Sequence, residues 1–331
     1  MNDNITPYVR YIGADDKDLD LFESQYVVPQ GISYNSYVIT DEKIAVMDTI
    51  DQRKTDEWTA RLEEALEGRT PDYLIVQHME PDHAANIGWF AEKYPEATIV
   101  ASAKAIQMMP QFFEEVNFAG RTQTVKEGDT LCLGQHTLKF IMAPMVHWPE
   151  VMLTYEESEK ILFSADAFGK FGALCHEGEW IDEARRYYFN IVGKYGAQVQ
   201  ALLKKAAGLD IAMICPLHGP VLKENLGYYI GLYDTWSKYE PETEGVVVAY
   251  ASIHGNTAAA ARRMAEILSE KGAAEVMLID LCRDDMALAV ESAFRYSKMI
   301  VAASSYDAGV FPPMLSLIHI SEPTRHSLIS Y

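Results

Sequence analysis

The sequence predicts an α/β protein in which a sandwich of two sheets, covered by outer helices, precedes a doubly wound parallel sheet. Three observations predict this fold class. Strands and helices alternate from about 58 to 115, and β-rich sequence follows from 131 to 163. A polar, proline-broken segment at 238–245 indicates an interdomain linker. After it, an apolar strand at 246–250 begins a second strand–helix alternation, which is typical of a parallel sheet.

The individual elements follow from hydrophobic periodicity and turn residues. In the first part, the expected strands lie at 26–29, 34–39, 44–49, 73–76, 98–100, 131–133, 137–142, 151–155, 161–163 and 211–214, and the expected helices at about 58–66, 84–93, 104–115 and 181–207. In the second part, a helix is expected at 257–270 among strands at 246–250, 276–281 and 299–303. We therefore expect domains at 1–240 and 246–315, followed by a tail at 316–331.

The balance of charges excludes several classes of partner. Asp and Glu outnumber Lys and Arg by 48 to 28, which gives a formal net charge of -20. Nucleic acid and anionic membrane surfaces repel such a polyanion, so neither is expected to bind it. The N-terminus lacks the regions of a signal peptide, and no apolar run approaches the roughly 18 residues of a membrane helix. The four cysteines form no CxxC pair, which fits a cytoplasmic protein without disulfides.

The segment His78-Met79-Glu80-Pro81-Asp82-His83 places four potential metal ligands directly after the expected strand at 73–76. Irregular backbone at the carboxyl end of a strand allows such side chains to converge on one point. Pro81 stiffens the loop and so lowers the entropy that is lost when a metal binds. This hexapeptide predicts a metal site.

Three further candidates, His147, Asp166 and His218, also follow apolar runs, with glycine or proline nearby. A single histidine or aspartate after a strand is more often a turn or cap residue than a ligand. Seven such residues, four of them within one hexapeptide, are not explained in that way. All seven are therefore expected to bind metal.

With these residues the sequence resembles the flavodiiron proteins (A-type flavoproteins), a branch of the metallo-β-lactamase superfamily, over about residues 20 to 315. The hydrolases of the superfamily carry His-x-His-x-Asp-His, whereas the flavodiiron pattern is His-x-Glu-x-Asp-His, and Glu80 stands in place of the middle histidine. The resemblance implies a metallo-β-lactamase-like αββα sandwich followed by a flavodoxin-like domain. It implies one iron on His78, Glu80 and His147, a second on Asp82, His83 and His218, a bridge through Asp166, and support of the site by Asp48.

The ligand chemistry agrees with iron. Replacement of an imidazole by the carboxylate of Glu80 hardens the site and favours iron over softer metals. Two ferrous ions, three carboxylates and one bridging hydroxide carry no net charge, which a buried pocket tolerates. Two irons with an open position each can pass electrons to a diatomic ligand, whereas zinc has no redox chemistry.

Two loops of the second part resemble those with which flavodoxins bind flavin mononucleotide (FMN). Ser252-Ile253-His254-Gly255-Asn256-Thr257 follows the first strand and precedes a helix, as the phosphate loop does. Its hydroxyls and backbone N–H groups would bind the phosphate, although an ordinary N-capped helix start is the alternative. The second loop, Ser304-Ser305-Tyr306-Asp307, would pack against the isoalloxazine ring, with Tyr306 able to stack on it.

The flavodoxin pattern breaks off after about 70 residues, whereas a flavodoxin domain has five strands. The tail LSLIHISEPTRHSLISY resembles nothing in the family. We expect it to be foreign sequence from a truncated or misjoined gene, and the unfinished sheet to have an exposed edge.

The resemblance implies a flavodiiron oxidoreductase that reduces nitric oxide to nitrous oxide, oxygen to water, or both, with electrons from a reduced donor (a small redox protein or a reduced cofactor) through FMN. It also implies a head-to-tail homodimer, in which the flavin of one subunit lies near the diiron site of the other. Of the neighbouring Tyr187 and Tyr188, we assign Tyr188 as the donor of a hydrogen bond or proton to the bound gas, with core packing as the alternative. Two other functions stay open, a zinc-dependent hydrolase and a catalytically incompetent fragment.

Overall fold

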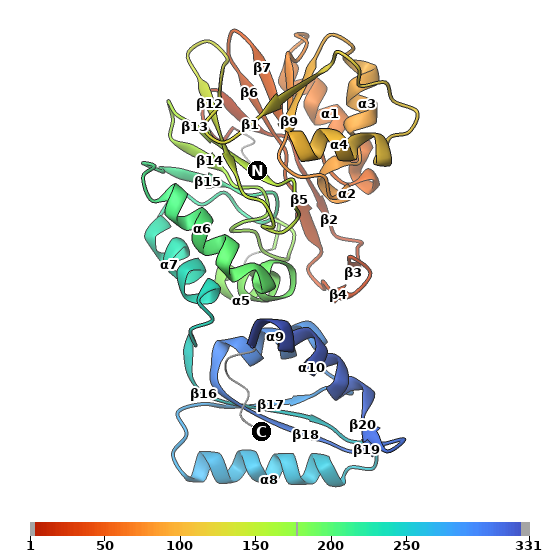
Figure 1. Cartoon of the computed structure of the whole chain (residues 1–331), viewed down its shortest axis with the longest axis vertical. Helices are drawn as coiled ribbons and strands as arrows, with labels where there is room; N and C mark the ends of the chain where they lie inside the picture. The colour runs from red at the N-terminus through yellow and green to blue at the C-terminus, as the bar shows by residue number, and fades with distance from the viewer. Residues whose placement is uncertain (1–3, 177, 326–331) are drawn as a thin grey trace.

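The computed structural model describes residues 4–176 and 178–325. Its larger part is a sandwich of two sheets, which confirms the predicted fold class (Figure 1). The first sheet has the strand order β1-β6-β7-β8-β9-β10 and the second β11-β12-β13-β14-β15. The bounds are Val9–Tyr11, Tyr37–Thr40, Ile44–Met47, Tyr73–Val76, Thr98–Ser102 and Thr122–Val125 in the first sheet, and Thr130–Cys132, Thr137–Met142, Met152–Glu156, Ile161–Phe163 and Met213–Cys215 in the second. Four short strands form two small ribbons, β2 (Ala14–Asp16) with β5 (Ile32–Tyr34) and β3 (Leu21–Phe22) with β4 (Tyr26–Val27).

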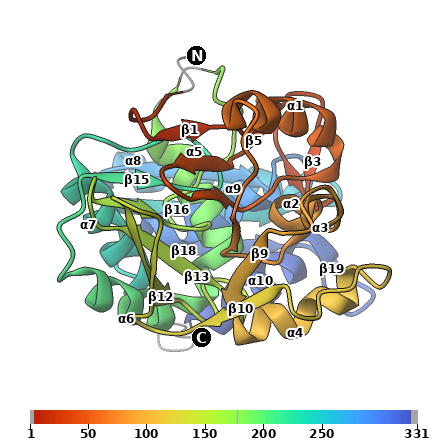
Figure 2. The ribbon, with the colours of Figure 1, turned by 90° about the horizontal axis from the view of Figure 1, so that it is seen from above.

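Helices cover the outer face of each sheet, as Figure 2 shows from above. The first sheet is covered by α1 (Thr55–Leu66), α3 (Ile87–Lys93) and α4 (Ala103–Phe112), and the second by α6 (Gly196–Ala206) and α7 (Leu226–Ser237). Fully buried side chains from both sheets, among them Met47, Ile75, Phe140 and Phe163, form one core cluster. Burial of these apolar faces is the main force that holds the two sheets together.

Strand direction brings the candidate ligands to one end of the sandwich. Strands β7, β8 and β9 run parallel in the first sheet, and β14 runs parallel to β15 in the second. Strand β12 has the same direction as β14, because both are antiparallel to β13. The loops that follow β7, β8, β12, β14 and β15 therefore carry Asp48, the hexapeptide, His147, Asp166 and His218.

The helical stretch expected at 181–207 is not continuous. It consists of α5 (Trp180–Tyr187), a π-helical turn (Tyr188–Val192), a 3-10 turn (Gly193–Tyr195) and α6. The hydroxyl of Tyr239 inserts at this break, where it accepts a hydrogen bond from Gly196 N–H and donates one to the Gly193 carbonyl. A Cβ at Gly196 would lie 2.7 Å from that hydroxyl, so glycine is required for the close approach.

The smaller part is a parallel sheet of order β17-β16-β18. Its strands are β16 (Thr243–Ala251), β17 (Val276–Asp280) and β18 (Tyr296–Ala303). Helix α8 (Asn256–Glu270) covers one face, and α9 (Met286–Arg295) and α10 (Pro312–Arg325) cover the face towards the sandwich (Figure 1). A short hairpin, β19 (Ser305–Tyr306) and β20 (Gly309–Val310), follows β18.

The tail is helical as far as the structure describes it. Residues 315–325 extend α10, and Leu317 is buried beside Met314 in the main core cluster. The open sheet edge was expected, and β18 lies at it with the side chain of Val301 half exposed. Residues 326–331 lie outside the described part of the chain.

Charged and aromatic contacts join the two parts. Arg185 on α5 forms ion pairs with Glu242 before β16 and with Glu291 on α9, the latter at 3.0 Å. Arg186 pairs with Asp285, the N-cap residue of α9, at 2.8 Å. Phe189 stacks on Phe294 with a centroid distance of 4.8 Å. The smaller part is therefore docked on the sandwich, rather than tethered only by residues 238–245.

Among the described residues, no helix combines the length and the apolar character that crossing a membrane requires.

Candidate metal centre

The hexapeptide changes from extended to helical backbone in its middle. Glu80 has φ -61° and ψ 138° and caps the short helix α2 (Pro81–Ala84), with Pro81 in the first turn. Proline suits this position because its fixed φ fits the helix and the first turn needs no N–H donor. Because of this change in backbone conformation, the side chains point to two different positions. His78 and Glu80 belong to one group of ligand atoms, and Asp82 and His83 belong to another.

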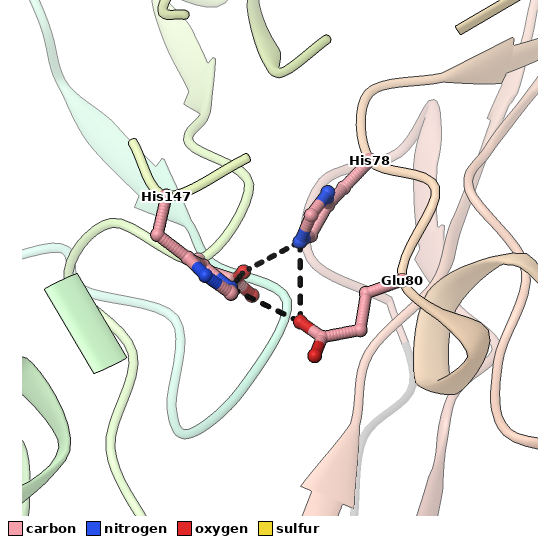
Figure 3. Close-up of side chains that lie close together, drawn as sticks. His78, Glu80 and His147 are labelled. Carbon is pink, nitrogen blue, oxygen red and sulfur yellow. Dashed lines mark hydrogen bonds and ion pairs between the residues drawn. The ribbon is translucent and has the colours of Figure 1, made fainter. Parts of the chain in front are cut away.

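The first group contains His78, Glu80, His147 and Asp166. Glu80 Oε2 lies 3.2 Å from His78 Nε2 and 3.0 Å from His147 Nε2. Asp166 Oδ2 lies 3.2 Å from each of the same two nitrogens. Figure 3 shows the three side chains of His78, Glu80 and His147 converging from two different loops. Their ligand atoms surround one point, as a metal ion requires.

The second group contains Asp82, His83 and His218. Asp82 Oδ2 lies 3.3 Å from His83 Nε2 and 3.1 Å from His218 Nε2. The other oxygen of Asp166, Oδ1, lies 3.1 Å from His83 Nε2 and 3.8 Å from His218 Nε2. Asp166 therefore directs one carboxylate oxygen to each group, which is the arrangement of a bridging ligand.

The buried polar atoms of the site require a cation. Both oxygens of Asp82 and of Asp166, together with Nε2 of His83 and of His218, are buried without a hydrogen-bond partner. Each such atom would cost about 1–3 kcal/mol if left unsatisfied, and a buried charge costs more. Two metal ions among these atoms remove that cost. The nitrogen and carboxylate donors fit iron, and their chemistry excludes a thiolate site.

Residues that do not bind metal hold several ligands in place. Asp48 adopts a left-handed φ of 54° after β7, which aspartate tolerates. Its carboxylate accepts hydrogen bonds from Gln77 N–H at 2.7 Å, from the Gln77 amide at 2.8 Å and from His78 N–H at 3.3 Å. Burial raises the pKa of Asp48 to about 6, although these hydrogen bonds oppose the shift. Asp48 thus fixes the backbone on which the hexapeptide begins.

The two imidazoles His78 and His218 have different partners at Nδ1. Nδ1 of His78 lies 2.8 Å from Oε1 of Glu150, and both side chains are buried. Nδ1 of His218 lies 2.6 Å from the Ser33 carbonyl. In both cases the partner orients Nε2 towards the metal position, but only Glu150 adds a negative charge, which makes the imidazole a stronger ligand. The sequence analysis did not identify Glu150, although it lies three residues after His147 in the same loop.

Without metal, the site favours protonated imidazoles. Burial alone would lower the pKa of His147, but the nearby carboxylate of Asp166 and the hydrogen bond with Glu80 raise it to about 9. Burial also opposes protonation of His78, yet the charge of Asp166 holds its pKa well above the ordinary value. Metal must displace these protons.

Tyr187, rather than Tyr188, faces the ligands. The ring of Tyr187 lies 5.5 Å from that of His218, and the charges of Asp166, Asp82 and Glu80 add to burial in raising its pKa well above the ordinary value. Tyr188 packs instead against Tyr233 and Trp236. The sequence shows the two tyrosines only as neighbours, and it could not show that a π-helical turn starts at Tyr188 and that Tyr187 is the one beside His218.

A further acidic residue missed in the sequence is Glu23, in the turn between β3 and β4. Its carboxyl group lies beside that of Glu80. Although the residue as a whole is exposed, desolvation of this carboxyl group and the charge of Glu80 raise the pKa of Glu23 to about 7. Glu23 is far from the hexapeptide in the sequence and belongs to no motif. Only the folding of the hairpin over the site brings it there.

The two expected flavin loops lie together at the carboxyl ends of β16 and β18. Ile253 N–H donates to Ser304 Oγ at 3.3 Å, and Thr257 Oγ1 lies 3.0 Å from the same oxygen. Gly255 has a φ of 86° and its N–H donates to Ser252 Oγ at 3.1 Å, directly before α8. His254, Asn256, Ser305, Tyr306 and Asp307 lie in the same loops.

Comparison with known proteins agrees with this geometry. Residues 32–219 match the family described as ODP family beta lactamase. The chain is 31% identical over 310 residues to the uncharacterized protein MJ0732 of Methanocaldococcus jannaschii, which covers 92% of this chain and 77% of the relative. It is 30% identical over 332 residues to an anaerobic nitric oxide reductase flavorubredoxin of Aliivibrio fischeri, which covers 96% of this chain and 66% of the relative.

A putative diflavin flavoprotein A 2 of Synechocystis is 32% identical over 84% of this chain and 49% of the relative. The chain thus spans about half of that relative and about two thirds of the flavorubredoxin.

Solved structures extend the likeness to nearly the whole chain. Rubredoxin oxygen:oxidoreductase of Desulfovibrio gigas superimposes with a TM-score of 0.91 at 26% identity, covering 98% of this chain and 82% of the other. The flavodiiron protein of Giardia intestinalis gives a TM-score of 0.90 at 26% identity, covering 97% and 79%. These folds contain both the sandwich and the flavodoxin-like part. The family match, the relatives and the buried pair of ligand groups together establish that this chain belongs to the flavodiiron protein family.

Proposed function

We propose that the chain reduces a small diatomic gas, nitric oxide to nitrous oxide or oxygen to water, at a diiron centre. The observation that carries this proposal is the position of Glu80, whose carboxylate lies between two histidines at distances that one metal would bridge. A third histidine at this position would give the ligand set of a zinc hydrolase. The negative charges of Glu80, Asp82 and Asp166 favour iron and stabilise its higher oxidation state.

The residues of the site would have separate roles. His78, Glu80 and His147 would hold one iron, Asp82, His83 and His218 would hold the other, and Asp166 would bridge them. The two irons would supply the electrons and bind the gas. Burial of the ligands excludes bulk water and strengthens every charge interaction at the site. Tyr187 lies beside His218 and is therefore our revised choice, in place of Tyr188, for the donor of a hydrogen bond or proton to the bound gas.

FMN would bind at the two loops that meet at Ser304, and would pass electrons to the irons. The convergence of Ser252, Thr257 and Ser304 at the start of α8 supports this proposal, because hydroxyls and free N–H groups at a helix N-terminus stabilise a phosphate. The electron donor would be a small redox protein or a reduced cofactor. A head-to-tail homodimer would bring the flavin loops of one subunit to the irons of the other.

The proposal includes both gases because the names of similar proteins mention both. One relative is called a nitric oxide reductase, and a structural neighbour is called an oxygen oxidoreductase. The test is anaerobic purification followed by measurement of iron and flavin, and by consumption of both gases side by side. About two irons per chain and consumption of either gas are expected. Two zinc ions with no gas consumption would contradict the proposal.

A further inference from the structure

An apolar cavity of about 360 Å³ lies between the five-stranded sheet and the helices α6 and α7. We call it the apolar well. Its lining comes from both helices, from the sheet, from the two loops that follow β12 and β14, and from the segment between α6 and β15. No flavin loop and no ligand side chain takes part in the lining, so the well is distinct from the sites described above.

The well leads from the surface into the core. At its inner end Val146, Ala167, Phe168 and Ile214 are buried. At its outer end, residues near the end of α6, such as Leu203 and Ala207, are partly or fully exposed. The cavity is therefore open at the surface between α6 and α7 and closed by buried side chains within.

The inner end borders the backbone that carries two metal ligands. Val146 directly precedes His147, and Ala167 and Phe168 directly follow Asp166, which serves both ligand groups. Phe168 stacks on Tyr233 at 4.2 Å, and Phe168 N–H donates to the Tyr233 hydroxyl at 2.5 Å. These contacts fix an aromatic wall next to the bridging aspartate. The bottom of the well thus borders the backbone next to His147 and Asp166.

The lining has the chemistry of a site for a small apolar molecule. Asp210 is its one charged residue, and the carboxylate of Asp210 pairs with Lys160 at the surface. Water is held poorly by such walls, because it needs two to four polar partners, whereas xenon and small hydrocarbons enter cavities of this kind. Oxygen and nitric oxide are small, uncharged and only weakly bound to water, so they are more soluble in an apolar cavity than in solvent.

We infer that the apolar well is the holding site and access route through which a small apolar gas reaches the metal centre. The inference rests on the proposed function for the identity of the gas. The well itself can be tested without any reaction. Displacement of the side chain of Phe168 or Val146 would open the last step to the metals.

Xenon is the probe for the test, in pressurised crystals or by 129Xe NMR of the full chain with and without metal. Ala207→Trp places a large ring at the mouth of the well. Ala201→Trp is the matched control, because Ala201 is an exposed alanine on α6, which ends next to Ala207, and it does not line the well. The second measurement is stopped-flow oxidation of the chemically reduced, iron-loaded protein by oxygen, which needs no flavin.

We expect xenon in the well of the parent chain, and a loss of xenon occupancy in Ala207→Trp but not in Ala201→Trp. The second-order rate constant for oxidation should fall about fivefold or more in Ala207→Trp alone. Absence of xenon from the well, an unchanged rate constant in Ala207→Trp, or a lipid or a peptide found in the well would each overturn the inference. Xenon in the well of a protein that reduces neither gas would instead contradict the proposed function.

Discussion

Glu150→Gln tests whether the charge behind His78 strengthens the first metal position. Oε1 of Glu150 lies 2.8 Å from His78 Nδ1 and accepts from Met79 N–H at 2.9 Å. Burial opposes ionisation, but the hydrogen bond with His78 keeps the pKa of Glu150 below its ordinary value, so the group is a carboxylate. Glutamine can retain Oε1 in both contacts while it removes the charge and replaces Oε2 by an amide nitrogen.

The expected magnitude follows from two separate effects. Loss of a carboxylate behind a metal-binding histidine weakens metal affinity about 10–100-fold, or roughly 1.4–2.8 kcal/mol. The weakening should affect only the metal held by His78, Glu80 and His147. The amide nitrogen would replace Oε2, which is buried without a partner, so folding should also weaken by about 1–3 kcal/mol.

The assay is competitive titration of metal against a chelator, with thermal unfolding of the metal-free protein as a second readout. Glu156→Gln is the matched control, because Glu156 is a buried glutamate that accepts from Ser158 N–H and Glu159 N–H and lies outside the two metal groups. A lowered stability with normal affinity for both metals in Glu150→Gln, as in the control, would refute the assigned role.

Three further predictions concern the domain junction, acidity and the tyrosines. Arg185→Ala leaves Glu242 and the buried Glu291 without their ion-pair partner. The free energy of unfolding by denaturant should therefore fall by about 3–5 kcal/mol. Arg263→Ala, the control at an exposed ion pair, should change it by less than about 1 kcal/mol. The raised pKa of His147, about 9 against an ordinary 6.5, adds stability to the metal-free protein below pH 6.5 that is lost as the pH rises through 9. As the pH rises over the same window, metal affinity should increase and the number of protons released on binding should decrease. Calorimetry at several pH values measures both quantities. Values that do not change with pH would contradict this prediction. Tyr187→Phe should slow reduction of the gas about tenfold, and Tyr188→Phe should leave the rate unchanged. Both are measured by stopped-flow oxidation of the reduced, iron-loaded protein. A slower reaction in Tyr188→Phe and an unchanged one in Tyr187→Phe would exclude the role of Tyr187.

Local sequence signals located the cluster of candidate metal ligands, because these residues follow strands of clear apolar character. His78, Glu80, Asp82 and His83 share one loop, and the remaining ligands stand after further apolar strands. The structure brings all seven into the two ligand groups. Residues that act through tertiary contacts gave no such signal. Glu23 reaches Glu80 only through a hairpin.

The helical regions show the limits of periodicity. The stretch at 181–207 was expected to be one helix because its composition favours helix throughout, but the insertion of Tyr239 breaks it at Gly193 and Gly196. Helix α7 was not predicted, and its mixed exposure gives only a weak amphipathic pattern. The tail was expected to be foreign sequence, and in the structure Leu317 continues an apolar face that begins at Met314. A helix can extend into unrelated sequence wherever an apolar side chain meets an existing core.

Diffraction at the iron and zinc absorption edges, from crystals of protein isolated without added metal, tests the assignment of the centre most directly. Two iron peaks are predicted, with a carboxylate oxygen of Glu80 about 2.0–2.2 Å from the one near His78 and His147. Zinc alone at both positions, or a Glu80 carboxylate turned away from the metals, would contradict the assignment of a redox-active diiron pair.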